Sequence, residues 1–317
     1  MTNNFVQRAR RIPAPDAVPT VTVNPVTLQA PGRGLPLELR ITAPLTGDAV
    51  PIVLLSHGGG RTQYLESKDG FAPLADFYAS HGLAVIQPTH LSSLSGGLGL
   101  DRDAPGHPLF WRSRIEDLTR ILDALDAVEA QAPVIAGRLD HARIAVVGHS
   151  AGGNTASVLL GARRADAPED LRDPRISAGV LLSSAGSPDG MLDAVREAFP
   201  ELQTDFSALT TRTLVVYGDA DESPHLTTRG AAWHTESYQL SPGADALLSL
   251  PGGKYYLGGI MGYSLAETDD EDPERLAVTQ RMTWAYLRSA LSDGDPAWQR
   301  AVEALNDDPS LGAVQTR

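Results

Sequence analysis

The stretch that decides the fold is RIAVVGHSAGG, residues 143–153. Its first part, Arg143–Val147, is a short apolar run of the kind that forms a buried parallel strand. The next part, Gly148–Gly152, has the pattern Gly-x-Ser-x-Gly, and an Ala/Val/Leu-rich helical segment follows it. In this strand–turn–helix context the pattern presents a serine hydroxyl as a nucleophile. The serine backbone is strained in such a turn, so a Cβ at either flanking glycine would clash. We therefore predict that Ser150 lies at the tip of the turn, beside the positive end of the following helix.

Short apolar runs bounded by glycine or proline recur along the chain and alternate with helical patterns. The runs that predict strands are Pro51–Ser56, Leu83–Gln87, Arg143–Val147, Ala178–Ser183, Thr213–Tyr217 and Ala246–Leu250, preceded by an alternating hairpin over Val21–Gln29 and Leu35–Pro44. Amphipathic spacing predicts helices over Trp111–Ala130 and Pro273–Leu291. Strands separated by helices predict an α/β fold with a mostly parallel, eight-stranded sheet flanked by helices.

The domain organisation follows from where this alternation begins and where it is interrupted. We expect residues 1–19 to form a flexible N-terminal arm and residues 20–317 a single domain. Two irregular segments near residues 90–111 and 189–209 are expected to be small cap or lid inserts that wall a pocket. The first 20 residues lack the apolar core of a signal peptide, and no stretch is apolar enough to span a membrane, so we expect a cytoplasmic protein.

Composition excludes several classes of protein. The 317 residues carry a net charge of −13, which disfavours a nucleic-acid partner. The absence of cysteine excludes disulfides, thiolate metal sites and a cysteine nucleophile. An acidic run from Glu267 to Asp272 would offer oxygens to Ca²⁺, but acidic residues ahead of a helix are already explained by its positive end. We therefore predict no metal, and no nucleotide-binding motif indicates a cofactor.

A second motif is Ser56-His57-Gly58-Gly59-Gly60, directly after the strand predicted over Pro51–Leu55. Glycines at this point let backbone N–H groups approach a developing oxyanion. The predicted donors are the amides of Gly59 and of Ala151, the residue after the nucleophile. We expect His57 to support this loop.

A third motif, Tyr217-Gly218-Asp219-Ala220-Asp221, follows the Thr213–Tyr217 strand. With these three motifs the chain resembles the α/β-hydrolase fold family over nearly its whole length. The family order is nucleophile, acid, histidine, with the acid in a Gly-x-x-Asp turn, so the resemblance implies that Asp221 is the acid. Asp219 is expected to hydrogen-bond the turn.

The finer features are similar to a branch of compact serine esterases that includes chlorophyllases, platelet-activating-factor acetylhydrolases and bacterial polyester hydrolases. The resemblance implies a serine hydrolase that acts on a small-molecule carboxylic ester through an acyl-enzyme on Ser150 and uses no cofactor.

The chain departs from the family at the histidine. After the last predicted strand it reads Gly252-Gly253-Lys254-Tyr255, so Tyr255 stands where the family has its catalytic histidine. A phenol with a pKa near 10 stays protonated at neutral pH and cannot accept the serine proton. Two interpretations therefore stay open: an esterase that is impaired or inactive, and a non-hydrolytic protein. The latter would be a small-molecule binder, or a lyase or cyclase with Tyr255 as general acid.

The remaining histidines differ in what we expect of them. His225, four residues after Asp221, is the expected substitute base. His90 and Trp111 are expected to line the substrate pocket, and His149 to point away from Ser150. The others, His81, His107, His141 and His234, are expected to be ordinary surface or loop residues.

Overall fold

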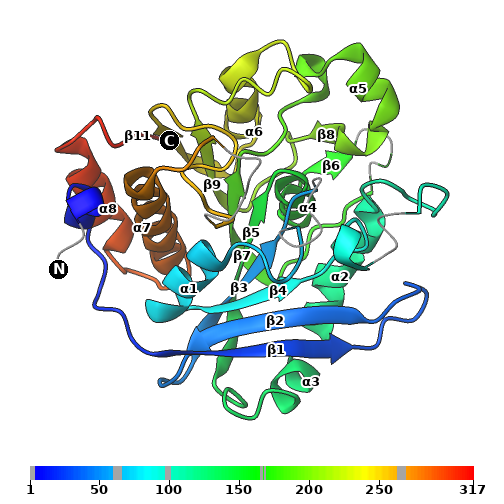
Figure 1. Ribbon diagram of the computed structural model, residues 1–317, viewed down its shortest axis with the longest axis horizontal. Helices are drawn as coiled ribbons and strands as arrows, with labels where there is room; N and C mark the ends of the chain where they lie inside the picture. Colours follow the sequence, from blue (N-terminus) through cyan, green and yellow to red (C-terminus); the bar gives the residue numbers. More distant parts are fainter. Residues whose placement is uncertain (1–3, 60–65, 97–100, 165–166, 168, 263–268) are drawn as a thin grey trace.

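Nine strands form one sheet in the order β1-β2-β4-β3-β5-β7-β9-β10-β11 in the computed structural model (Figure 1). The model describes residues 4–59, 66–96, 101–164, 167, 169–262 and 269–317. The strands of the sheet are β1 (Thr20–Leu28), β2 (Leu37–Pro44), β3 (Val50–Ser56), β4 (Ala84–Pro88), β5 (Leu139–His149), β7 (Ile176–Leu182), β9 (Arg212–Gly218), β10 (Ala244–Leu250) and β11 (Ala313–Thr316). The six strands from β4 to β10 in this order pair in parallel, whereas β1, β2 and β11 pair antiparallel at the two edges.

The predicted mostly parallel sheet and its opening hairpin are confirmed, but the predicted count of eight strands is one too low. The missed strand, β11, has four largely exposed residues and no apolar run that would mark it in the sequence. A separate two-stranded sheet of β6 (Arg163–Arg164) and β8 (Thr204–Asp205) is too short to leave a pattern.

Helices cover both faces of the sheet (Figure 1). The α-helices are α1 (Ala72–Ser80), α2 (Trp111–Asp123), α3 (Leu125–Ala130), α4 (Ala151–Leu159), α5 (Asp193–Ala198), α6 (Glu236–Leu240), α7 (Pro273–Ala290) and α8 (Ala297–Asn306). Short 3₁₀ segments are η1 (Asn4–Val6), η2 (Ala9–Arg11), η3 (Leu94–Gly96), η5 (Pro188–Gly190), η6 (Pro200–Leu202) and η7 (Gly230–Thr235). No helix among the described residues combines the length and the hydropathy needed to cross a membrane.

Alternate residues of the central strands enter two separate cores. Val53 and Leu55 of β3 pack in the core that includes α1, α7 and α8, whereas Ile52 and Leu54 pack in the core that includes α2, α3 and α4. Because both faces are covered, all seven residues of β3 are buried. This arrangement leaves the carboxyl ends of the parallel strands, and the loops that follow them, as the place for a site.

Two of the predicted helices differ in detail from the structure. The helix expected over Trp111–Ala130 is divided at Ala124, whose backbone leaves the helical conformation at φ −120° and ψ 21°. Its apolar face is nevertheless buried throughout α2 and α3. The helix expected over Pro273–Leu291 is α7, and the Asp272 carboxylate caps it by accepting from the amides of Glu274 and Arg275. Of the acidic run considered for Ca²⁺, Glu267 lies outside the described residues.

The N-terminal segment, expected to be a flexible arm, packs against the domain over its described part. Ala9 and Ile12 are fully buried, and the Arg8 guanidinium lies 2.6 Å from the Glu274 carboxylate of α7. The sequence did not indicate this docking because it depends on contacts with a helix more than 260 residues away.

Candidate active site

Ser150 lies in the sharp turn between β5 and α4. Its backbone has φ +54° and ψ −120°, and its N–H donates to the carbonyl of Leu182 in β7. A Cβ on Gly152 would lie 2.1 Å from the Ser56 carbonyl oxygen, and one on Gly148 would lie 2.1 Å from the Gly152 carbonyl oxygen. Real Cβ atoms never approach so closely, so both flanking positions require glycine, as the sequence predicted.

A cavity of about 200 Å³ opens beside this serine. Its lining joins loops from several strand ends to the two irregular segments: Gly59, Leu109, Ser150, Ala151, Asn154, Ser183, Ala185, Phe199, Leu202, His225, Leu226, His234 and Tyr255. Leu109 comes from the segment 90–111, of which residues 97–100 lie outside the described part. Phe199 and Leu202 come from the segment 189–209. The cavity therefore brings together Ser150, the two expected oxyanion donors and the residue at the histidine position.

Gly59 and Ala151 are neighbours at this cavity. A Cβ on Gly59 would lie 4.0 Å from the Ala151 Cβ, and Ala151 is the first residue of α4. Backbone amides at the start of a helix carry partial positive charge, and the first of them have no partner inside the helix. This geometry suits two amides that donate to one carbonyl oxygen.

Tyr255 occupies the position next to the serine. Its Oη donates a hydrogen bond to Ser150 Oγ. Burial raises the pKa of the Tyr255 phenol above its ordinary value, so the group is neutral and remains a donor. The loop that carries it is held at two points, because His149 Nε2 donates to the Tyr255 carbonyl at 2.9 Å and the Asp219 carboxylate accepts from the Gly252 amide at 2.7 Å.

The Asp221 carboxylate faces His234 in this structure. Asp221 Oδ2 and His234 Nε2 are 3.2 Å apart, and both residues are almost completely buried. Burial acts to raise the pKa of Asp221, but the His234 contact, the Ser223 hydrogen bond and the charge of His149 together lower it. His234 Nδ1 lies 2.8 Å from the Ser184 carbonyl oxygen, which can only accept, so Nδ1 carries a proton. Nε2 is the ring nitrogen that faces the carboxylate.

The expectation that His234 is an ordinary surface or loop residue is wrong. Its side chain is 1% exposed and lines the same cavity as Ser150. One signal was available, since Ser150, Asp221 and His234 follow one another in the family order of nucleophile, acid and histidine. It was missed because His234 precedes the last parallel strand instead of following it.

His225, the expected substitute base, is exposed and lines the cavity with Ser150. Its ring makes no hydrogen bond to other residues in the described ranges, so both nitrogens are available. In His234, by contrast, both ring nitrogens face other groups.

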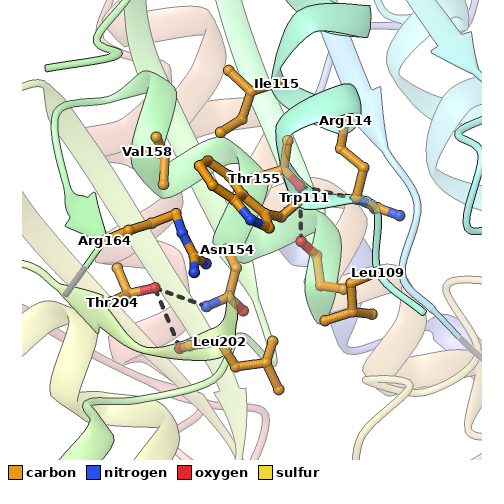
Figure 2. A pocket seen from close by; sticks show the side chains of 11 residues that line it. Leu109, Trp111, Arg114, Ile115, Asn154, Thr155, Val158, Arg164, Leu202 and Thr204 are labelled. Atoms are coloured by element: carbon orange, nitrogen blue, oxygen red, sulfur yellow. Dashed lines mark hydrogen bonds between the residues drawn. The ribbon is translucent and has the colours of Figure 1, made fainter. Parts of the chain in front are cut away.

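Of the two residues expected to line the substrate pocket, His90 lies away from the Ser150 cavity and Trp111 lines a cavity beside it. His90 is buried away from the Ser150 cavity, where Nδ1 donates to Asp117 Oδ2 at 2.9 Å and Nε2 accepts from Ser56 Oγ at 3.0 Å. The reason is that a buried carboxylate on α2 captures the imidazole. Trp111 lines a smaller neighbouring cavity of about 20 Å³, where its ring lies 4.0 Å from the Arg164 guanidinium (Figure 2).

Burial of His149 should make the free energy of unfolding depend on pH. Burial lowers the pKa of His149 to about 4, whereas an unfolded histidine has a pKa near 6.5. The unfolded chain therefore binds the proton more tightly, and stability that is fully present above pH ~6.5 is lost as the pH falls towards ~4. We expect this residue to contribute about 3 kcal/mol to that loss.

Urea unfolding of the protein between pH 7 and pH 4 checks this prediction. A His149→Gln variant keeps a donor for the Tyr255 carbonyl but should show a shallower dependence on pH, and His107→Gln serves as the half-buried control. Equal slopes in all three proteins would contradict the prediction.

Comparison with known proteins agrees with this arrangement. A model of the alpha/beta hydrolase family matches residues 52–312, which include every residue of the Ser150 cavity. No curated protein matches the chain. The match spans most of the 317 residues, and the parallel sheet with its serine turn is the architecture expected of such a protein. The chain belongs to the alpha/beta hydrolase family.

Proposed function

We propose that the protein is a serine hydrolase that cleaves small carboxylic esters through an acyl-enzyme on Ser150. The observation that carries the proposal is the strained backbone of Ser150 at the start of α4, beside Gly59 and Ala151 at one cavity. Ser150 Oγ would bond to the ester carbonyl carbon while the two amides donate to the developing oxyanion. The C–O bond to the alcohol then breaks, and the alcohol leaves with the proton that Ser150 gave up. Water attacks the acyl carbon, its OH stays on the released acid, and its other proton restores the Ser150 hydroxyl.

Tyr255 makes this chemistry slow. Its neutral phenol donates to Ser150 Oγ and so leaves the serine without a base at the position where the family has its histidine. It cannot accept the serine proton, because its pKa is raised further by burial. His225 is the remaining base candidate, since it lines the cavity with free ring nitrogens.

The cavity favours compact esters. A volume of about 200 Å³ is below the range of drug-sized pockets, and Leu109, Phe199 and Leu202 give it apolar walls.

Hydrolysis of p-nitrophenyl acetate and butyrate tests the proposal directly. We expect slow release of nitrophenol that disappears in Ser150→Ala. If the two proteins release it equally, the non-hydrolytic alternatives take its place: a small-molecule binder, or a lyase or cyclase with Tyr255 as general acid.

Trp111 should limit the length of the acyl chain. It lines the small cavity that shares Leu109, Ala151, Asn154 and Leu202 with the Ser150 cavity. We expect Trp111→Ala to open this space and to raise the ratio of kcat/KM for octanoate over butyrate by at least about tenfold.

The measurement is a p-nitrophenyl ester series from acetate to octanoate. Trp298→Ala is the matched control, because Trp298 packs on Tyr286 beside α7, remote from the cavity. A chain-length profile that is the same in all three proteins would remove Trp111 from the pocket wall.

A further inference from the structure

Arg114 of α2 is a buried cation beside the Ser150 cavity. Its residue is 1% exposed, and no carboxylate of the described residues lies within ion-pair distance of its guanidinium. Its donors reach three neutral oxygens: Nη2 donates to the His57 carbonyl, Nη1 to Ser92 Oγ, and Nε to Thr155 Oγ1 at 3.0 Å. A buried cation without a direct counterion is costly to fold around, so its retention calls for a functional reason.

Two of these contacts lead to the two oxyanion donors. The His57 carbonyl belongs to the loop that carries Gly59 two residues later. Thr155 Oγ1 accepts from Arg114 (Figure 2). It donates its own proton to the Ala151 carbonyl at 3.0 Å. One guanidinium thus holds the Gly59 loop directly and the first turn of α4 through one hydroxyl.

The Gly59 loop is held from its other side by two histidines. The His90 amide donates to His57 Nε2 at 3.0 Å, so His57 Nδ1 carries the proton and donates to the Gly58 carbonyl at 2.7 Å. Burial lowers the pKa of His57 well below its ordinary value, which keeps this ring neutral. The two carbonyls directly before Gly59, those of His57 and Gly58, therefore both accept a hydrogen bond.

The nearby Asp117 carboxylate does not neutralise Arg114. Asp117 Oδ1 accepts from Arg33 Nε at 2.7 Å, and Oδ2 accepts from His90 Nδ1. Burial lowers the pKa of Arg114 to about 9, so it is still a cation at neutral pH. Its positive charge is thus uncompensated by direct contact, one hydrogen bond away from the loop that carries Gly59.

We propose that Arg114 is the positioning residue of the oxyanion hole: it fixes the amides of Gly59 and Ala151 relative to each other and supplies positive potential to the tetrahedral anion. This inference rests on the proposed function of Ser150. Because the anion exists only in the transition state, Arg114 should affect kcat much more than KM.

The test combines ester kinetics with binding of phenylboronic acid, which forms a tetrahedral anion on a serine hydroxyl. We expect Arg114→Met to lower kcat for p-nitrophenyl butyrate about 10²-fold and to weaken boronate binding by a similar factor, with KM changed less than about threefold. Arg114→Lys keeps the charge but loses the forked contacts, and should fall between Arg114→Met and the unmodified protein.

Two variants of Thr155 test the same inference with Arg114 in place, so they do not require the protein to fold without this arginine. Thr155→Val removes the bridging hydroxyl with little change of shape and should lower kcat and boronate affinity about tenfold, whereas Thr155→Ser should restore both. Arg281→Met is the control, because Arg281 donates to the Ile12 carbonyl far from the cavity.

The outcomes separate this inference from the proposed function. Variants that unfold at lower temperature but keep kcat and boronate affinity would show a purely structural Arg114 and overturn the inference. Absence of serine-dependent ester hydrolysis would contradict the proposed function. Boronate binding, measured by calorimetry, would still compare the Arg114 and Thr155 variants with the unmodified protein. If the unmodified protein binds no boronate, the inference fails as well.

Discussion

Replacing Tyr255 with histidine is expected to raise the rate of ester hydrolysis by about 10²–10⁴-fold, the usual contribution of a positioned general base. An imidazole with a pKa near 6.5 can accept the serine proton at neutral pH, whereas the phenol cannot. The loop that carries residue 255 already places its side chain against Ser150 Oγ. The gain should appear as the pH rises through the pKa of the new imidazole, because only its neutral form accepts a proton.

The measurement is kcat/KM for p-nitrophenyl butyrate between pH 5 and pH 9, together with the rate of fluorophosphonate labelling of Ser150. Tyr255→Phe is the matched control and should change the rate by less than about threefold, a small effect for a single neutral hydrogen bond. A flat rate in Tyr255→His, combined with loss of activity in His225→Ala, would identify His225 as the base. Loss of a measured activity in Tyr255→Phe would instead assign a chemical role to the phenol.

The His234–Asp221 contact should limit this gain. A histidine at position 255 needs a carboxylate to orient it, and Asp221 Oδ2 already faces His234 while Oδ1 accepts from Ser223. We therefore expect Tyr255→His/His234→Gln to be faster than Tyr255→His alone.

Replacing Gly152 with alanine is expected to lower the free energy of unfolding by about 3–5 kcal/mol and to abolish labelling of Ser150. The added Cβ would lie 2.1 Å from the Ser56 carbonyl oxygen and 2.6 Å from that of His57. Both oxygens belong to a backbone that β3 and Arg114 hold in place, so the turn must move instead. Such a movement displaces Ser150 and the Ala151 amide together.

Gly137→Ala is the control for this prediction. Gly137 has φ +71° but no heavy atom within 4 Å of an added Cβ, so alanine there costs only the left-handed backbone, about 1 kcal/mol. Urea unfolding of the two variants separates steric overlap from backbone strain. Equal losses of stability would show that the close approach at Gly152 is relieved at little cost.

The features predicted from sequence are those that depend on short stretches of chain. The turn around Ser150 needs two glycines at fixed spacing, and the central strands need only runs that are apolar on both faces. The cap of α7 needs an acidic residue directly before a proline. Each of these signals is complete within about ten residues.

The features that the sequence did not reveal depend on distant partners. His234 gains its place only when η7 packs against the end of β7 and the turn after β9. His90 is drawn from the pocket by Asp117, a charge on a helix that begins 21 residues later. The sequence around Arg114 does not indicate its hydrogen bonds either, because the three acceptors lie on separate segments of the chain.

The order of the parallel strands also bears on how the protein folds. Residues of the cavity span positions 59 to 255, and they meet only because β3, β5, β7, β9 and β10 lie side by side in the sheet. Parallel pairing closes long loops, and such non-local contacts form slowly. A chain that lacks these pairings has neither the Leu182 carbonyl that accepts from the Ser150 N–H nor Gly59 and Tyr255 beside the serine. Covalent labelling of Ser150 would therefore count only molecules whose five central strands have assembled, and would report the unfolding of this part of the sheet from a single hydroxyl.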